Sequence, residues 1–264
     1  MSHLMKNYGR LPVSFDHGQG VWLWDKEGHK YLDALAGIAV NSVGHAHPRL
    51  VRAIADQASK LIHCSNYFNI DLQEQVAEKL VEHSGLEAVF FCNSGLEANE
   101  CAIKIARKFG HAKGIEVPNI IVLKHAFHGR SIATLSATGN PSVRADFSPY
   151  TEGFIFVDES DLDGIRKIVE ENKNVVAIFF EPILGEGGVV PIDLSVIKGI
   201  REICDEHDLL MMCDEVQCGM GRSGKWFAHQ WAEIKPDVIT MAKGLAGGVP
   251  VGAVIVSEKA NIFK

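Results

Sequence analysis

The chain has 264 residues, of which 47% are hydrophobic and 22% are charged, and its formal net charge at pH 7 is −7. Such a length suffices for one or two domains with a sizeable core, and the composition excludes fibrous and disordered classes. The acidic balance gives no indication of a nucleic-acid or anionic-membrane partner. The longest strictly apolar run, residues 175–180, is far too short for a membrane helix.

Two further features indicate the cellular compartment. The first 20 residues carry Lys6, Arg10 and Asp16 and lack the apolar core of a secretory signal. The six cysteines are scattered without a CxxC pair, which favours free thiols in a reducing compartment over a disulfide framework or a zinc site. The sequence therefore predicts a cytoplasmic globular protein.

The first 45 residues differ in pattern from the rest of the chain. Short runs at 21–25 and 30–35 flank the turn signal Lys26-Glu27-Gly28 and predict an antiparallel hairpin. From about residue 70, helical periodicity alternates with short apolar runs typical of strands buried on both faces. Helices are predicted over 71–83, 95–108, 161–172 and 194–207, and strands over 87–92, 120–124, 153–157, 175–180, 209–213, 237–241 and 252–256.

This alternation predicts the α/β class, with a mostly parallel sheet of about seven strands, right-handed crossovers and flanking helices. Ligands in such folds bind beyond the carboxyl ends of the strands, so the chemically informative residues are expected there. Only eight residues follow the last predicted strand, which suggests that the polypeptide is truncated.

One candidate site is the start of the helix after the strand at 87–92. Ser94 and Glu97 form an S-x-x-E capping box, and the backbone N–H groups of Gly95 and Leu96 would be free to bind an anion such as phosphate. The alternative is an ordinary capped helix, since many helices begin in this way.

Two charged residues follow apolar strands farther along the chain. Asp214 comes directly after the run 209–213 and would be partly buried, so it needs a cationic partner such as a protonated ring nitrogen. Lys243 ends the next strand, where a desolvated amine loses its proton more readily and can bond to a carbonyl carbon. A structural Asp and a lysine that reaches solvent remain the alternatives. No cluster with metal-ligand spacing lies nearby, so no metal is predicted.

The helix start, the carboxylate and the lysine fall at corresponding ends of neighbouring predicted strands. Together they offer what pyridoxal 5′-phosphate (PLP) requires, namely a phosphate cradle, an acid opposite the pyridine nitrogen and an amine for the aldehyde. A competing motif, Gly219 to Lys225, matches a P-loop, but Trp226 stands where Ser or Thr would hold magnesium. A nucleotide-binding protein therefore remains the alternative from another functional class.

The chain resembles the class-III, ornithine-type aminotransferases of the fold-type I PLP enzymes over essentially its whole length. The motifs that carry the resemblance lie at 35–45, 93–100, 126–130, 181–188, 214–217 and 242–250. The resemblance implies that the phosphate meets the backbone at 94–96, that Phe127 stacks on the ring, and that Asp214 pairs with the ring nitrogen. The implied cofactor-binding set is Ser94, Gly95, Leu96, Phe127, His128, Asp214, Glu215, Val216, Gln217 and Lys243, with Lys243 and Asp214 as catalytic residues.

For the substrate, the resemblance implies that Arg130 clamps a carboxylate, that Glu181 lies near the ring, and that Glu186 is the glutamate that pairs with an arginine in relatives. Related enzymes that use free ornithine usually carry tyrosine where this sequence has Ile38. This apolar residue favours N-acetylornithine as amino donor, with 2-oxoglutarate as acceptor in a ping-pong reaction of arginine biosynthesis. Ornithine, 4-aminobutyrate, succinylornithine and succinyl-diaminopimelate remain alternatives.

The resemblance also implies a domain organisation and an assembly. Residues 1–45 would form the N-terminal segment of a small domain and 46–264 the PLP-binding large domain, whereas the C-terminal small domain of relatives has no counterpart in this sequence. Family likeness implies a homodimer. A non-catalytic fragment that only dimerises is therefore a further alternative.

Overall fold

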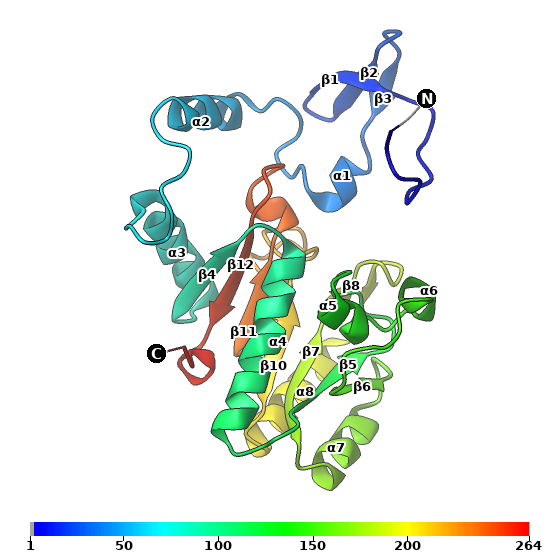
Figure 1. The fold of residues 1–264 in the computed structure, drawn as a ribbon, viewed down its shortest axis with the longest axis vertical. Helices are drawn as coiled ribbons and strands as arrows, with labels where there is room; N and C mark the ends of the chain where they lie inside the picture. Colours follow the sequence, from blue (N-terminus) through cyan, green and yellow to red (C-terminus); the bar gives the residue numbers. More distant parts are fainter. Residues whose placement is uncertain (1–2, 264) are drawn as a thin grey trace. The chain divides into compact units, whose positions relative to one another are not determined.

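The computed structural model describes residues 3–263, which form two compact units, one up to Phe68 and the other from Asn69. The predicted assignment of 1–45 and 46–264 to a small and a large domain stays a prediction. Each unit has its own sheet, as the ribbon shows (Figure 1).

The first unit contains a three-stranded antiparallel sheet and two helices. Its order is β1 (Phe15–Gln19), β2 (Trp22–Asp25) and β3 (Lys30–Leu32), followed by α1 (Ala36–Ala39) and α2 (Pro48–Ala58). The predicted hairpin is present as β2 and β3, whereas β1 was not predicted. The sequence of β1, FDHGQ, is mostly polar and gives no apolar strand signal.

The hairpin turn is built on Asp25. Its buried carboxylate accepts hydrogen bonds from the backbone N–H groups of Glu27 and His29, at 3.0 and 2.8 Å, and from the hydroxyl of Tyr31 at 2.8 Å. An aspartate that bonds the backbone two residues on is a common way to fix such a turn.

The second unit is built on a seven-stranded sheet in the order β4-β12-β11-β10-β7-β5-β6. Its neighbours from β11 to β6 pair in parallel, which confirms the mostly parallel sheet. The strands are β4 (Ala88–Cys92), β5 (Asn119–Leu123), β6 (Phe154–Val157), β7 (Val175–Phe180), β10 (Leu210–Asp214), β11 (Val238–Met241) and β12 (Gly252–Val256), and a separate two-stranded sheet contains β8 (Ile183–Leu184) and β9 (Val190–Pro191).

β12 is the exception to the parallel arrangement. It lies between β4 and β11 and is antiparallel to both. Residues 242–251 are too few for the helical crossover that a parallel return needs. The carboxyl ends of β4, β11 and β10 therefore meet at one edge of the sheet, although β12 separates β4 from the other two.

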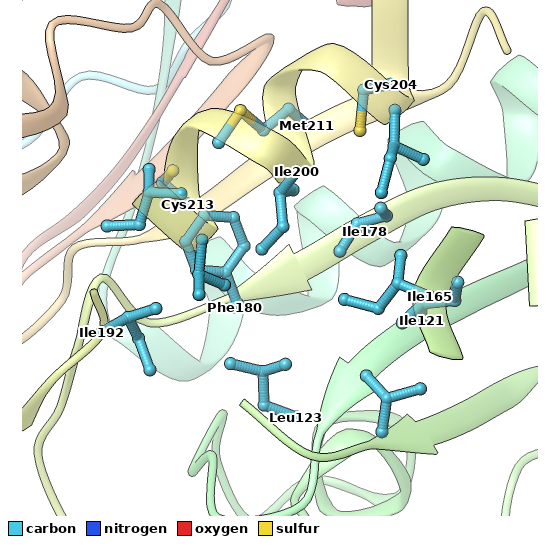
Figure 2. Close-up of a cluster of buried hydrophobic side chains, with 14 of the residues drawn as sticks. Ile121, Leu123, Ile165, Ile178, Phe180, Ile192, Ile200, Cys204, Met211 and Cys213 are labelled. Carbon is cyan, nitrogen blue, oxygen red and sulfur yellow. The ribbon is translucent and has the colours of Figure 1, made fainter. Parts of the chain in front are cut away.

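Helices cover both faces of this sheet. The helices are α3 (Asp71–Ser84), α4 (Gly95–Ala112), α5 (Ile132–Ala137), α6 (Pro141–Arg144), α7 (Leu162–Glu171) and α8 (Leu194–Glu206). α4 packs on one face through a core that includes Ala102, Phe179 and Met212. On the other face, α7 and α8 pack against residues such as Phe180, and Figure 2 shows this second core. Because neighbouring side chains of a strand point to opposite faces, Phe179 and Phe180 belong to different cores.

Within residues 3–263, no helix combines the length and the apolar character that crossing a membrane would require.

Candidate active site

Asp214 ends β10, and its carboxylate is almost fully buried, with 3% of the residue exposed. Oδ2 lies 2.8 Å from Nδ1 of His128 and accepts a hydrogen bond of 2.7 Å from Nδ2 of Asn99, while Oδ1 accepts one of 3.0 Å from the backbone N–H of Val216. Among the described residues, no lysine or arginine forms an ion pair with this carboxylate, and its histidine contact is a hydrogen bond from the imidazole of His128. The carboxylate is thus fixed by three donors without a lysine or arginine to neutralise it.

His128 lies in the segment between β5 and α5, beside the carboxyl edge of the sheet. Its ring stacks on Phe179 with a centroid distance of 4.1 Å and an interplanar angle of 17°. Its backbone N–H donates to Oγ1 of Thr138 at 3.0 Å, and its Nε2 is buried without a hydrogen-bond partner in the described chain. Because a carboxylate only accepts, Nδ1 carries the proton toward Asp214.

Asn99 was not predicted as a site residue. It lies on α4, is 2% exposed, and its amide connects Asp214 to the backbone oxygen of His128, each at 2.7 Å. The available sequence signal was a polar residue on the buried face of an amphipathic helix, but its partners are far away in the chain.

The start of α4 confirms the predicted cap. The hydroxyl of Ser94 accepts a hydrogen bond from the backbone N–H of Glu97 at 3.2 Å, and the carboxylate of Glu97 accepts one from the backbone N–H of Asn93 at 2.8 Å. The first N–H groups of a helix lack partners within the helix, so Gly95 and Leu96 present donors here.

Gly95 is where this helix start meets the other two motifs. A Cβ at position 95 would lie 2.6 Å from Cγ1 of Val216 and 3.3 Å from Cβ of Ala242. The predicted phosphate cradle therefore adjoins both the residue two after Asp214 and the residue before Lys243. A side chain larger than hydrogen at position 95 would collide with Val216 and force these three segments apart.

Lys243 follows β11 and begins the 3-10 turn η2 (Lys243–Leu245). Its φ of 40° is unusual for a residue other than glycine and indicates a constrained backbone, as often found at functional sites. Burial lowers the pKa of its amine, and the nearby carboxylates of Asp214, Glu186 and Glu181 oppose this change without cancelling it. The amine is thus closer to its neutral, nucleophilic form than an exposed lysine would be.

Glu181 follows β7 and is also buried at this edge, with 5% exposed. Its carboxyl oxygens accept hydrogen bonds from the backbone N–H groups of Phe127, at 2.8 Å, and Gly185, at 3.0 Å. Burial, together with the charge of Asp214, raises the pKa of Glu181 to about 7. The carboxyl group of Glu181 therefore faces the interior of the fold and not the solvent.

The predicted ring-stacking and carboxylate-binding residues lie together. The guanidinium carbon of the exposed Arg130 is 5.7 Å from the ring centroid of Phe127, which is only partly buried.

The predicted residue Gln217 lies against the segment that follows β8. Gly185 packs directly against the side-chain amide of Gln217, which leaves no room for a Cβ at position 185. Glu186 is exposed next to this contact.

Two predicted residues have a different environment. The carboxylate of Glu215 accepts hydrogen bonds from the backbone of Ala228 and His229 and lies 2.8 Å from Nδ1 of His229, so its predicted cofactor contact stays a prediction. Ile38 lies in the first unit with 52% exposed, and its predicted substrate contact also stays a prediction.

The lysine of the P-loop-like motif is held within its own loop. Nζ of Lys225 donates to the backbone oxygen of Gln230 at 2.9 Å and lies 4.6 Å from the ring centroid of Trp231. A P-loop lysine must instead reach a bound phosphate. This geometry removes the main support for nucleotide binding.

The residues at the sheet edge fit PLP. Asp214 offers a buried carboxylate for a protonated ring nitrogen, Lys243 an amine with a lowered pKa, and the cradle at Gly95 a set of backbone donors for a phosphate.

Comparisons with known proteins agree with this geometry. The profile of the family described as "Aminotransferase class-III" matches residues 4–263. The acetylornithine aminotransferase of Nitrosomonas europaea is 54% identical over the whole chain, which covers 67% of that protein. The corresponding enzyme of Synechocystis is 48% identical over the whole chain, which covers 63% of it.

Solved structures give the same result. An ornithine aminotransferase from Toxoplasma gondii superposes with a TM-score of 0.93 at 34% identity, covering 98% of this chain and 62% of that one. Another structure of that enzyme, with a TM-score of 0.92, has partial PLP occupancy at its active site. An N-acetylornithine aminotransferase from Stenotrophomonas maltophilia superposes with a TM-score of 0.83 at 39% identity, over 96% of this chain and 64% of that one.

The chain spans about two thirds of the length of the curated relatives that it matches. Within that span, the family profile covers nearly every residue, and the motifs at 93–100, 214–217 and 242–250 lie at one edge of the sheet. The chain belongs to the class-III aminotransferase family.

Proposed function

We propose that the protein is a PLP-dependent aminotransferase that moves the δ-amino group of N-acetylornithine to 2-oxoglutarate. The observation that carries this proposal is the meeting of a lysine of lowered pKa, a buried carboxylate and a glycine cradle at one sheet edge. When bound, PLP supplies an aldehyde and a protonated ring that accepts the electron pair of a substrate C–H bond.

The residues of the chain have separate tasks in this reaction. The amine of Lys243, favoured in its neutral form by burial, would serve as the base that accepts the proton from the substrate carbon and would later act as its donor. Asp214 holds the proton on the ring nitrogen through a charge-assisted hydrogen bond. The backbone N–H groups of Gly95 and Leu96 anchor the phosphate at the helix start.

Further residues orient the substrate and the ring. Arg130 is exposed beside Phe127 and can bind a substrate carboxylate with two parallel hydrogen bonds. Phe127 is itself fixed by Glu181, which accepts a hydrogen bond from its backbone N–H. The amino donor and the keto-acid acceptor react one after the other at this single site, so ping-pong kinetics are expected.

The choice of N-acetylornithine rests on two supports. Curated relatives named acetylornithine aminotransferase reach 54% identity, against 34% for an ornithine aminotransferase of known structure. The second support is the apolar Ile38, which suits an N-acylated donor better than one with a second free amine. Ornithine, 4-aminobutyrate and succinylated donors are the competing substrates.

Single-turnover spectroscopy tests this proposal. The PLP-loaded protein is mixed with N-acetylornithine, ornithine or 4-aminobutyrate, and the loss of the visible absorbance of the bound cofactor is followed. N-acetylornithine should convert the spectrum fastest. An equal or faster response to free ornithine would overturn the substrate assignment, and no response to any donor would overturn the aminotransferase assignment.

The assembly and compartment are part of the same proposal. Family likeness supports a homodimer, which light scattering of the purified protein would test. The six cysteines are all free thiols in the structure, and this fits a reducing compartment such as the cytoplasm.

A further inference from the structure

We propose that Asn99 is a positioning residue that fixes the carboxylate of Asp214 for the cofactor ring nitrogen while leaving its negative charge unneutralised. This inference rests on the proposed function, because it concerns the residue that would meet the PLP ring. It adds a residue from the second turn of α4 to a site whose predicted residues on that helix lie in its first turn.

The position of Asn99 is not explained by the helix in which it lies. Asparagine is a poor helix former in a helix interior, where its amide competes for backbone groups. The amide of Asn99 instead donates both of its N–H bonds across the fold, to the backbone oxygen of His128 and to Oδ2 of Asp214, each at 2.7 Å. The side chain is 2% exposed, so neither bond is shared with bulk water.

The two acceptors also fix which way the amide points. A flipped amide would place Oδ1 against two oxygen atoms that can only accept, so Nδ2 must face them. Oδ1 of Asn99 is then buried without a partner in residues 3–263. The amide thus leaves its buried oxygen unpaired while both of its N–H groups bond to His128 and Asp214. These two contacts therefore determine the orientation of the Asn99 side chain.

The hydrogen bonds around Asp214 leave one acceptor position open. A carboxylate offers about four lone-pair positions. Asn99 and His128 occupy Oδ2, and the backbone N–H of Val216 occupies one position on Oδ1. The second position on Oδ1 remains for a donor from the cofactor.

The neutrality of Asn99 matters as much as its geometry. A lysine or arginine at this place would pair with Asp214 and compete with the protonated ring nitrogen for its charge. An amide holds the same oxygen without carrying a charge. The titratable groups near this carboxylate are His128, Glu181, Lys243 and the thiols of Cys213 and Cys218, and none of them belongs to α4.

The test compares Asn99→Leu, Asn99→Asp and a control, Asn172→Leu. Leucine branches at Cγ as asparagine does but has no hydrogen-bond donors. Asn172 donates a comparable amide hydrogen bond to Oδ1 of Asn119, at the start of β5. For each purified protein, the dissociation constant of PLP and the pH midpoint of the visible absorbance of the bound cofactor are measured, with thermal melting of the cofactor-free form.

Asn99→Leu should weaken PLP binding by about tenfold, the usual effect of one hydrogen bond to a charged group. The same substitution should also raise the pH midpoint of the visible absorbance of the bound cofactor. With Asp214 less well oriented, the ring nitrogen loses its proton more readily, and its positive charge no longer opposes protonation at the nitrogen that joins Lys243 to PLP. Asn172→Leu should leave both values unchanged.

Asn99→Asp separates donation from packing. A protonated aspartic acid can donate to Asp214, whereas an ionised one repels it, so the PLP affinity of this variant relative to the parent should recover as the pH falls. The inference would be overturned if Asn99→Leu bound PLP with the parental affinity and kept the parental pH midpoint of the cofactor absorbance. It would also be overturned if the melting temperature of the variant changed while this pH midpoint did not. Absence of PLP at Lys243 in the parent would instead refute the proposed function.

Discussion

Asp214 and Glu215 follow one another at the end of β10, and each is buried with a histidine Nδ1 2.8 Å from its carboxylate. The carboxylate of Glu215 receives two further backbone N–H groups, from Ala228 and His229, and a weaker contact from the thiol of Cys218. Its acceptor positions are thus filled by the chain itself. Asp214 keeps one position open, so hydrogen-bond accounting distinguishes a structural acid from a functional one.

The two carboxylates differ because neighbouring side chains of a strand point to opposite faces of the sheet. Asp214 points to the face covered by α4, where Asn99 meets it. Glu215 contacts the 3-10 turn η1 (Ala228–Ala232) and fixes the loop that returns the chain to β11. Four substitutions can break or sharpen this comparison.

Asp214→Asn should have the largest effect. The amide keeps the size of the side chain but removes the charge that holds the ring proton, so kcat should fall by about 10²–10³-fold. Steady-state kinetics with N-acetylornithine measure the loss, and the melting temperature of the cofactor-free protein should also fall, because the new amide N–H group faces the donor of Val216 or those of Asn99 and His128. A variant with near-parental kcat would show that this carboxylate is not the functional one.

Glu215→Gln should act on stability instead. The new amide brings its own N–H bonds against donors from Ala228 and His229, so the free energy of unfolding should drop by about 3 kcal/mol. Urea denaturation measures this change. The folded variant should retain kcat within about threefold, since one RT of barrier changes the rate by about that factor. A large loss of kcat without loss of stability would reverse the assignment of the two acids.

Glu181 provides a pH-dependent test at the same sheet edge. Its pKa of about 7 in the folded protein lies above the ordinary value of 4.5, so the folded state holds a proton that the unfolded chain has already released. Stability of the cofactor-free protein should therefore fall as the pH rises through this window, by about 1.5 kcal/mol from about pH 5.5 to 7.

Glu181→Gln should remove that decline, because glutamine does not titrate. Urea denaturation of parent and variant at several pH values gives the comparison. Parallel pH profiles for the two proteins would contradict a raised pKa at Glu181.

Lys225→Ala should have the smallest effect. It removes a hydrogen bond to the backbone oxygen of Gln230 and a contact with Trp231, so we expect a loss of about 1 kcal/mol in stability. PLP affinity should not change, and ATP should not raise the melting temperature of the parent protein. Stabilisation by ATP that disappears in Lys225→Ala would support the nucleotide-binding alternative.

Local patterns predicted most of the fold. The seven core strands and the helices α3, α4, α7 and α8 lie where apolar runs and helical periodicity placed them, since these signals are local to each segment. The strand β1 lacks such a signal, and the antiparallel direction of β12 is set by the short connection at 242–251 rather than by its own residues.

The candidate site was predictable to a smaller extent. Asp214, Lys243 and the cap at Ser94 stand at ends of apolar runs, where sequence alone draws attention to them. Asn99 could not be found in this way, because its role depends on a contact with a residue 115 positions away. The difference between Asp214 and Glu215 likewise follows from which face of the sheet each one meets.

The central claim is that Lys243 carries the cofactor at this sheet edge. Reduction of the PLP-loaded protein with borohydride, followed by peptide mapping, tests it most directly, with Lys243→Ala as the control. The account predicts a stable PLP adduct on Lys243 and an unlabelled, colourless variant. An adduct on Lys225 or another lysine, or no adduct at all, would contradict it.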